Sequence, residues 1–447
     1  MGCIRFECLF CIVIAGMAIP PAAAEQSGQG GTWQRDKNPE AVAEVLAGKR
    51  KVANAAWWGF DEQDSTRFLQ AAIDSGAEKV IVSNMGADWV ITPITLADDQ
   101  EIFFEPGVVI AAKPGAFHGP HDSLFNAMDK KNITIGGYGA TLKMQKNDYM
   151  NPDLYEKAEW RSAILLNGVS HIKIYGLTIR DTGGDGIDLG DWGKGYSDNV
   201  SIRDMVFDNN YRQGISVISA ENLLIENCIL KNTSGTGPAS GIDLEPNNPN
   251  CRLINIVIRN CVAENNDGEG FIVAPAQLSS ESEDISVIVE NCYVKSSKGH
   301  GIQVSSVKDD GPKGFVEFRN CHVENVQGHG LRILDKSSAN AEFRFVNCTF
   351  NNVAASPSPD TSYEGVERLP IIIHLRGLSW STRPGGLEFV DCVVEDDRNR
   401  PAMAYRATFE NAPALYNVKG NITVKNPHGA RVDLGSKLNN VNLNINE

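Results

Sequence analysis

The chain has 447 residues, a formal net charge of −15 and an apolar content of 42%. A negative charge of this size favours solubility and argues against nucleic acid as a partner. A chain of this length would fill two or three ordinary domains, unless it forms a solenoid, which grows in one dimension and needs no division.

Residues 1–24 have the features of an export signal peptide. Arg5 precedes an apolar run from Leu9 to Ile19, and three alanines offer a cleavage site before Glu25. The apolar run is too short to cross a bilayer comfortably. We therefore expect a secreted or periplasmic protein with no membrane span after cleavage. A retained N-terminal anchor is the alternative.

A polar segment over residues 25–56 is expected to lead into one domain over residues 57–447. A helix is predicted from Asp64 to Gly76, because apolar residues fall on one side and a glycine ends it. The open end of a strand solenoid invites aggregation, so this helix is expected to cap it. Strands are predicted at 79–83, 89–96, 101–111, 132–143 and 162–166, with closing coils at 415–424 and 432–445.

The stretch from Thr182 to Leu334 repeats one short phrase six times. A glycine followed by an apolar residue occurs at Gly186-Ile187, Gly214-Ile215, Gly241-Ile242, Gly270-Phe271, Gly301-Ile302 and Gly330-Leu331. Successive glycines are 28, 27, 29, 31 and 29 residues apart. Self-similarity at such a period indicates a solenoid whose repeats bury their apolar faces by stacking.

A second repeated phrase indicates the kind of solenoid. It places a cysteine after Asn or Asp at Asn227-Cys228, Asn260-Cys261, Asn291-Cys292, Asn320-Cys321, Asn347-Cys348 and Asp391-Cys392. Apolar and polar residues alternate through both phrases with the period of strands, and no helical pattern intervenes. Coils of short strands and turns stack as a parallel β-helix.

The cysteines of this phrase are expected to be free thiols. Export would favour disulfides, but one cysteine per coil in the apolar phase fits a small buried hydrophobe. Cys251 is a seventh cysteine outside the phrase. No Cys-x-x-Cys spacing or histidine cluster accompanies these residues, so no metal site is predicted.

The N-terminal strands carry a resemblance to a known family. The runs Val80-Ile81-Val82, Ile94-Thr95-Leu96 and Ile102–Gly107, after the helix, resemble the start of right-handed parallel β-helix proteins of the pectate lyase and polygalacturonase type. With the coils, the resemblance covers residues 57–400. It implies right-handed coils, in a fold that hosts hydrolases, lyases, epimerases, phage tailspikes and adhesins.

Motifs of polygalacturonases are matched in part. Their Asn-Thr-Asp-Gly-Ile-Asp motif is similar to residues 183–188, which implies a catalytic carboxylate at Asp185. In the next coil the family has an Asp pair, where this chain has Arg212-Gln213. The family's Gly-His-Gly resembles Gly299-His300-Gly301, and its Arg-Ile-Lys resembles Arg332-Ile333 without the lysine. Both lie four to five coils from Asp185, farther than in the family.

Strand alternation predicts a line of outward side chains. If Ile187 points inward, the outward positions of the six repeats are Asp188, Ser216, Asp243, Ile272, Gln303 and Arg332. Coils stack at about 4.8 Å, so the backbones of Asp188 and Asp243 should lie ~9.6 Å apart, with Glu245 about 6.6 Å from Asp243 along its strand. Carboxyl separations of ~6.5–9.5 Å suit an inverting glycosidase.

These acids are the candidate catalytic residues: Asp185, Asp188, Asp243 and Glu245. The alternative is that they are ordinary carboxylates on a solvated face or at turns. Trp192 and Tyr196, with Tyr149, Tyr155 and Trp160 in the longest early insertion, are candidates to stack on sugar rings, or else to pack against the solenoid.

Basic residues form a second set of candidates for substrate binding. Arg212 and Arg332 could neutralise a uronate carboxylate. His300 and His329 precede the glycines of consecutive coils, so they should stack and could act as acid or base. Surface histidines at turns are the alternative interpretation.

The favoured hypothesis is an exported glycoside hydrolase that cleaves a polysaccharide or oligosaccharide with paired carboxylates. A uronate lyase or epimerase that uses Arg212 and the histidines is one alternative, and a non-catalytic glycan-binding or surface solenoid is another. We expect a monomer without a cofactor, and the sequence leaves open whether Ca²⁺ binds. Catalysis predicts a groove where the acids converge, whereas simple binding predicts a flat face with scattered acids.

Overall fold

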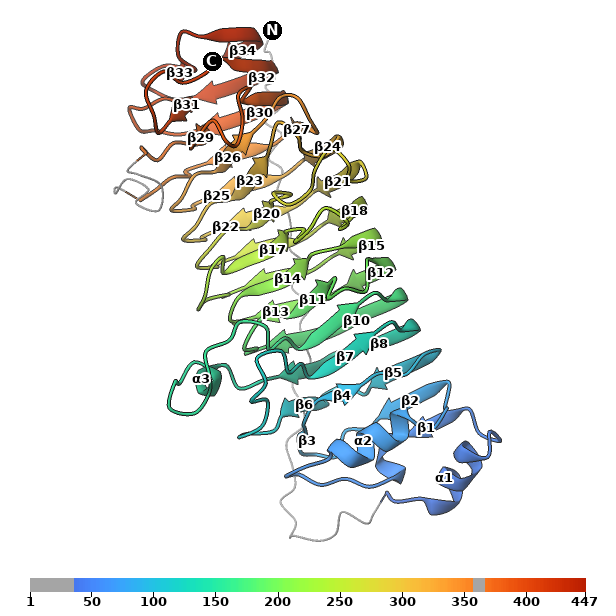
Figure 1. Cartoon of the computed structure of the whole chain (residues 1–447). Coiled ribbons are helices and arrows are strands. Elements are labelled where there is room, and N and C mark those ends of the chain that lie inside the picture. The colour runs from blue at the N-terminus through green and yellow to red at the C-terminus, as the bar shows by residue number, and fades with distance from the viewer. Residues whose placement is uncertain (1–35, 357–365) are drawn as a thin grey trace, which may run out of the picture.

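Each coil of the chain adds parallel strands to two sheets that run along one axis (Figure 1). The computed structural model describes residues 36–356 and 366–447. The expected signal peptide at 1–24, and residues 25–35 of the polar segment after it, lie outside the described residues. Within the described part of the chain, no helix is both long and apolar enough to cross a membrane.

Sheet B holds one strand from each coil, and it carries the Gly-apolar phrases. Its strands are β4 (Ile94–Thr95), β7 (Phe125–Met128), β9 (Ile164–Asn167), β11 (Ile187–Gly190), β14 (Gln213–Val217), β17 (Ser240–Leu244), β20 (Phe271–Val273), β23 (Ile302–Val307), β26 (Leu331–Lys336), β29 (Ile371–Leu375), β31 (Met403–Ala407) and β33 (Val432–Asp433).

Sheet A holds the rest of each coil, as two strands or as one long bent strand. Its strands are β1 (Val52–Asn54), β2 (Lys79–Val82), β3 (Trp89–Ile91), β5 (Gln100–Phe104), β6 (Val109–Ala112), β8 (Lys131–Lys143), β10 (Ser170–Arg180), β12 (Ser197–Arg203), β13 (Val206–Asp208), β15 (Ala220–Glu226), β16 (Ile229–Lys231), β18 (Leu253–Arg259), β19 (Val262–Glu264), β21 (Ile285–Glu290), β22 (Tyr293–Lys295), β24 (Gly314–Arg319), β25 (His322–Glu324), β27 (Glu342–Val346), β28 (Thr349–Asn351), β30 (Gly385–Glu395), β32 (Leu415–Lys425) and β34 (Leu438–Asn446).

The repeated phrases stack in register, as predicted. The apolar residues of the six Gly-apolar pairs are direct neighbours in sheet B: Ile187, Ile215, Ile242, Phe271, Ile302 and Leu331. All six are buried. Burying a side chain of this size stabilises a fold by roughly 1.5–3 kcal/mol, so the aligned apolar rows hold the coils together. The parallel β-helix expected from the sequence is confirmed.

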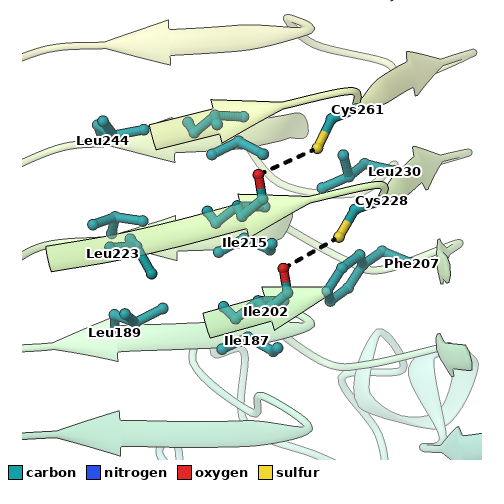
Figure 2. Packing of buried hydrophobic residues seen from close by; sticks show 14 of the residues in the cluster. Ile187, Leu189, Ile202, Phe207, Ile215, Leu223, Cys228, Leu230, Leu244 and Cys261 are labelled. Atoms are coloured by element: carbon teal, nitrogen blue, oxygen red, sulfur yellow. Dashed lines mark hydrogen bonds between the residues drawn. The ribbon is translucent and has the colours of Figure 1, made fainter. Parts of the chain in front are cut away.

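The cysteine ladder also lies where it was expected. Cys228 and Cys261 point into the core among Ile202, Leu230 and their neighbours (Figure 2). Both are free and buried. The thiol of Cys228 donates to the carbonyl of Glu226 at 3.3 Å and, more weakly, to that of Ile202 at 3.9 Å. The prediction of stacked free thiols is confirmed for the cysteines of the described chain.

The residue before each ladder cysteine makes the turn between the two strands of sheet A. Asn227 and Asn260 have positive φ angles of 56° and 55°, a left-handed conformation that asparagine tolerates better than most residues. The Asn260 side-chain amide donates to Asn227 Oδ1 at 3.2 Å. The turn residues therefore link neighbouring coils outside the core while the cysteines link them inside.

Helices cover the N-terminal end of the solenoid. The predicted helix is α2 (Thr66–Ile73), and a second helix, α1 (Pro39–Leu46), begins after Asn38, whose side chain accepts a hydrogen bond from Ala41 N at 3.0 Å. A 3₁₀ turn, Ala55–Trp57, joins this cap. Gln100 Nε2 donates to Ile73 O at 3.0 Å and Ala77 O at 2.8 Å, which ties the end of α2 to the first coils.

Two of the predicted strands are pairs of strands. Residues 89–96 divide into β3 and β4 around Pro93, and residues 101–111 divide into β5 and β6 around Pro106-Gly107. Proline cannot donate to a ladder, and Gly107 has a φ of +80°. These two prolines therefore lie at corners of the coil. A short helix, α3 (Lys146–Tyr149), lies in the early insertion.

Candidate active site

The predicted outward line of sheet B is confirmed residue by residue. Asp188 pairs with Ser216, and Ser216 pairs with Asp243. The side chains alternate with buried apolar neighbours on each strand, but they are not on a solvated face: Asp188 is 6% exposed and Asp243 is 1% exposed. The alternative of ordinary solvated carboxylates is wrong for these two residues, because loops cover this part of the sheet.

Arg212 lies at the centre of a cluster of carboxyl groups. It precedes β14 and its guanidinium lies 3.4 Å from Asp185 Oδ2, 3.5 Å from Glu159 Oε2 and 3.7 Å from Glu245 Oε2. The side chain of Arg212 is 15% exposed and that of Asp185 is 1% exposed, whereas Glu159 and Glu245 are 34% and 45% exposed. Asp185 and Arg212 therefore form the buried part of the cluster, and Glu159 and Glu245 form its solvent-exposed edge. Three of its members, Asp185, Arg212 and Glu245, were predicted from the sequence to be site residues.

Burial raises the pKa values of the buried carboxyl groups in this cluster. Loss of solvation raises the pKa of Asp185 well above its ordinary range, against the opposing charge of Arg212. Burial, and then the charge of Glu245, raises the pKa of Asp243 in the same way. The pKa of Asp188 rises to about 6, again mainly through burial. Burial thus favours the protonated form of Asp185 and Asp243, whereas Asp188, with a pKa of about 6, is largely ionised at neutral pH.

Hydrogen bonding satisfies the buried acids only in part. Gln213 Nε2 donates to Asp243 Oδ2 at 2.9 Å. The other oxygens, Asp185 Oδ1 and Asp243 Oδ1, have no hydrogen-bond partner among the described residues. Buried polar atoms are nearly always paired, so two bare carboxyl oxygens in one cluster indicate a site that makes its remaining contacts with a ligand or a solvent molecule.

Glu159 is the member of the cluster that the sequence did not reveal. It lies in the insertion between α3 and β9, where Arg161 forms an isolated antiparallel bridge with Gly183. That bridge brings the insertion against the coil of Asp185. Glu159 is one of several charged residues in its loop, so no sequence pattern distinguished it.

The predicted basic residues beyond Arg212 form a separate cluster. The rings of His300 and His329 stack with centroids 5.0 Å apart at 25°, as expected for consecutive coils. Arg332 Nη1 lies 3.0 Å from His300 Nε2 and 3.5 Å from Gln303 Oε1. Both histidines are buried, so the interpretation as surface histidines is wrong. Burial, followed by the charges of His329 and Arg332, holds the pKa of His300 well below its usual value.

The two clusters lie on one face but do not merge. Asp243 pairs with Ile272, which pairs with Gln303, which pairs with Arg332. At about 4.8 Å per coil, three steps place Arg332 roughly 14 Å from Asp243 along the axis. Arg332 is therefore too far from Asp243 to contact the same reacting bond, whereas His300 belongs to the coil of Gln303 and lies 3.9 Å from Glu269 Oε1.

The aromatic candidates divide into two groups. Tyr149 and Tyr155 are buried, and the Arg161 guanidinium lies 5.5 and 5.4 Å from their ring centroids. They pack against the solenoid, so sugar stacking is wrong for these two. Trp192 and Tyr196 are 41% and 36% exposed, and Arg252 covers the Tyr196 ring at 4.0 Å.

Other features do not add to the site. Within the described residues, no group of three or more His, Cys, Asp or Glu side chains is arranged to hold a metal ion. Cavities of about 450, 390 and 330 Å³ lie elsewhere; the largest is lined by Asn351, Asn352, Glu395, Asp396, Asp397, Lys425 and Pro427.

Comparison with known proteins identifies the family. The family described as right-handed β-helix region matches residues 127–255 and 197–358, which together span more than half of the chain. The chain belongs to this family. The right-handed coils and the likeness to pectate lyase and polygalacturonase proteins expected from the sequence are thereby confirmed.

One curated relative and several solved structures add detail to the family assignment. An uncharacterised Bacillus subtilis protein, YclG, is 27% identical over 161 residues, which are 34% of this chain and 27% of that protein. The matched part of the chain thus spans about a quarter of that relative's length.

The solved structures with similar folds differ in function. The A-module of the Azotobacter vinelandii mannuronan C-5 epimerase AlgE6 superposes with a TM-score of 0.60 at 15% identity, covering 88% of this chain and 99% of the module. The Streptococcus pneumoniae surface adhesin PfbA gives 0.58 at 13% identity, covering 84% and 89%. A family 28 exopolygalacturonase of Yersinia enterocolitica gives 0.50 at 14%, covering 89% and 78%. Identities this low show the shared fold alone.

Proposed function

We propose that the protein is a glycoside hydrolase that acts on an exported or extracellular polysaccharide. The observation that carries the proposal is the convergence of Asp185, Asp243, Glu159 and Glu245 around Arg212, with Asp188 two strands from Asp243. Polysaccharide-active enzymes among the proteins of similar fold, such as the exopolygalacturonase, support the substrate class.

The roles follow from the raised pKa values. Asp243, whose pKa is raised by burial, gives its proton to the glycosidic oxygen as the bond from that oxygen to the anomeric carbon breaks. Asp188, with a pKa of about 6, is ionised at neutral pH and takes a proton from the attacking water. The water oxygen bonds to the anomeric carbon, so each product gains one hydroxyl group.

The strand register bears on the stereochemistry. Asp188 and Asp243 are two strands apart, about 9.6 Å between backbones. An inverting mechanism needs carboxyl groups ~6.5–9.5 Å apart to leave room for water. We therefore infer inversion. Asp185 acts through Arg212: with Glu159 and Glu245 it holds the guanidinium beside the acid.

A uronate epimerase or lyase is the second candidate function, and the cluster around His300 favours it. A neutral imidazole next to Arg332 is the arrangement that proton abstraction beside a carboxylate requires. In that reaction the histidine removes the C5 proton while the arginine stabilises the charge on the carboxylate. In a lyase the C4–O bond then breaks as the C4=C5 double bond forms, and the departing oxygen takes a proton. In an epimerase a proton from water returns to C5 on the opposite face. The mannuronan epimerase module shares the fold.

The experiment that separates these functions is a glycan panel read in two ways. A hydrolase releases reducing ends, and its products do not absorb ultraviolet light. A lyase releases an unsaturated product that does absorb ultraviolet light. An epimerase changes the uronate composition without shortening the chain. A protein that binds glycans but gives none of these products would be a non-catalytic binding solenoid, as the fold shared with PfbA allows.

A further inference from the structure

Three aromatic side chains from separate loops stack on one another next to the acid cluster. His121 precedes β7, Trp160 precedes β9 and Trp192 follows β11. The His121 ring lies parallel to Trp160, with centroids 4.9 Å apart at 20°, and edge-on to Trp192 at 4.6 Å and 80°. We call these three residues the aromatic platform.

The platform is exposed, unlike the tyrosines of the same insertion. Trp160 and Trp192 are each 41% exposed, and His121 is exposed as well. Large aromatic rings on a protein surface leave apolar area in water, which is unfavourable unless a ligand covers it. Mutual stacking fixes the rings before a ligand arrives, so little conformational entropy is lost on binding.

The platform adjoins the acids directly. A Cβ atom placed at Gly190 would lie 2.9 Å from the Trp192 ring and 3.7 Å from Asp188 Oδ1. The indole and the carboxyl group thus approach the same point on β11. Trp160 follows Glu159, which pairs with Arg212. A chain-like ligand bound on the aromatic platform would therefore extend into the acid cluster.

The register places the platform on the N-terminal side of the acids. Asn126 of β7 pairs with Leu165 of β9, which pairs with Asp188. Asp243 lies two strands farther on, in the opposite direction. A chain that runs from Asp243 over Asp188 to the platform would lie along the solenoid axis.

We propose that His121, Trp160 and Trp192 form a sugar-binding subsite that holds the units of a glycan on the N-terminal side of the acids. The C–H face of a pyranose ring is apolar and flat enough to cover an indole, which distinguishes it from a charged ligand. This inference rests on the proposed function for its substrate class.

The test measures binding separately from cleavage. In an Asp243→Asn background, affinity electrophoresis and quenching of tryptophan fluorescence are followed with the polysaccharides of the panel. Trp192→Ala and Trp160→Ala are each expected to weaken binding about tenfold, the effect of losing one stacked ring, and Trp192→Phe should retain most of it. The matched control is Phe315→Ala, since Phe315 is 37% exposed on β24 of sheet A.

The outcomes distinguish the two proposals. Weaker binding in both tryptophan variants supports the subsite, even if the wild-type protein cleaves none of the glycans and the hydrolase proposal fails. Cleavage by the wild-type protein, with dissociation constants and KM unchanged in correctly folded Trp160→Ala and Trp192→Ala, overturns the subsite and leaves the hydrolase proposal intact. Absence of binding to every glycan on the panel also overturns it.

Discussion

Gln213 reaches across one coil to hold Asp243: its amide nitrogen donates to Asp243 Oδ2 at 2.9 Å. Gln213 begins β14 and lies directly after Arg212, so the start of this strand both positions the buried carboxyl group and brings a positive charge near it. The second oxygen of Asp243 has no hydrogen-bond partner in the described part of the chain. In the proposed mechanism, that oxygen carries the proton that passes to the substrate.

The charge of Arg212 should set the acid limb of the pH–activity profile. It lowers the pKa values of Asp185, Asp188 and Asp243, against the larger effect of burial. In Arg212→Gln these pKa values should rise, and the acid limb of kcat/KM should move upward by about one pH unit or more. Arg259→Gln, on the outer face of sheet A, is the control. An unchanged acid limb in a folded Arg212→Gln protein would contradict this role.

Asp188 should make the fold less stable as the pH rises. Its pKa is raised in the folded state from 3.8 to about 6, so the folded protein binds more protons than the unfolded chain between these values. The stabilisation is complete below pH 4 and is lost as the pH rises through 6. Relative to Asp188→Asn, the wild type should lose up to about 3 kcal/mol of unfolding free energy from pH 4 to pH 7.

Chemical denaturation at several pH values measures this difference. Asp310→Asn, which changes an exposed acid, should parallel the wild type. If Asp188→Asn does so as well, then the carboxyl group of Asp188 is not held in the protonated form by burial.

Lys336 should change the free energy of unfolding with pH in the opposite direction. It is buried, donates to the carbonyl oxygens of Ser337 and Gly385, and has a pKa lowered by burial to about 7. Between pH 7 and its ordinary value of 10.5, the unfolded chain binds the extra proton, so unfolding free energy should rise with pH. The rise relative to Lys336→Met should be about 2 kcal/mol from pH 7 to pH 9. Equal slopes for the two proteins would show that Lys336 titrates normally.

The six ladder cysteines and Cys251 should not react with thiol reagents while the protein is folded. The seven cysteines between Cys228 and Cys392 are free and buried. A thiol reagent should therefore label none of them before unfolding and all seven in guanidinium without reductant, as read by peptide mass spectrometry. Unlabelled pairs after unfolding would mean that the ladder forms disulfides.

The regular part of this fold could be predicted because its geometry repeats. One apolar residue per repeat identifies the strands of sheet B, and alternation then gives the outward neighbours. In-register stacking places Asp188, Ser216 and Asp243 in one line, as the structure shows. The prediction needed no knowledge of loop conformation, because parallel coils repeat the same side-chain directions.

The surroundings of the site could not be predicted because loops supply them. Glu159 reaches Arg212, and His121 reaches Trp160 and Trp192, through contacts between distant segments, such as the hydrogen bond of 2.8 Å from Arg161 Nε to Phe117 O. Asp188 and Asp243 are buried, although strand alternation placed them on an open face. Loop conformation depends on such individual contacts, and the repeat pattern contains no information about them.

The substitution Asp243→Asn shows whether Asp243 donates the proton that breaks a glycosidic bond. The amide keeps the shape and the contact with Gln213 but has no acidic proton. On the glycan that the panel identifies, the rate of reducing-end release should fall by roughly 10²–10⁴-fold, while Asp310→Asn keeps wild-type activity. Stability of the Asp243→Asn protein should be unchanged or higher, since a buried carboxyl group is removed. Wild-type cleavage by a folded Asp243→Asn protein would contradict the account.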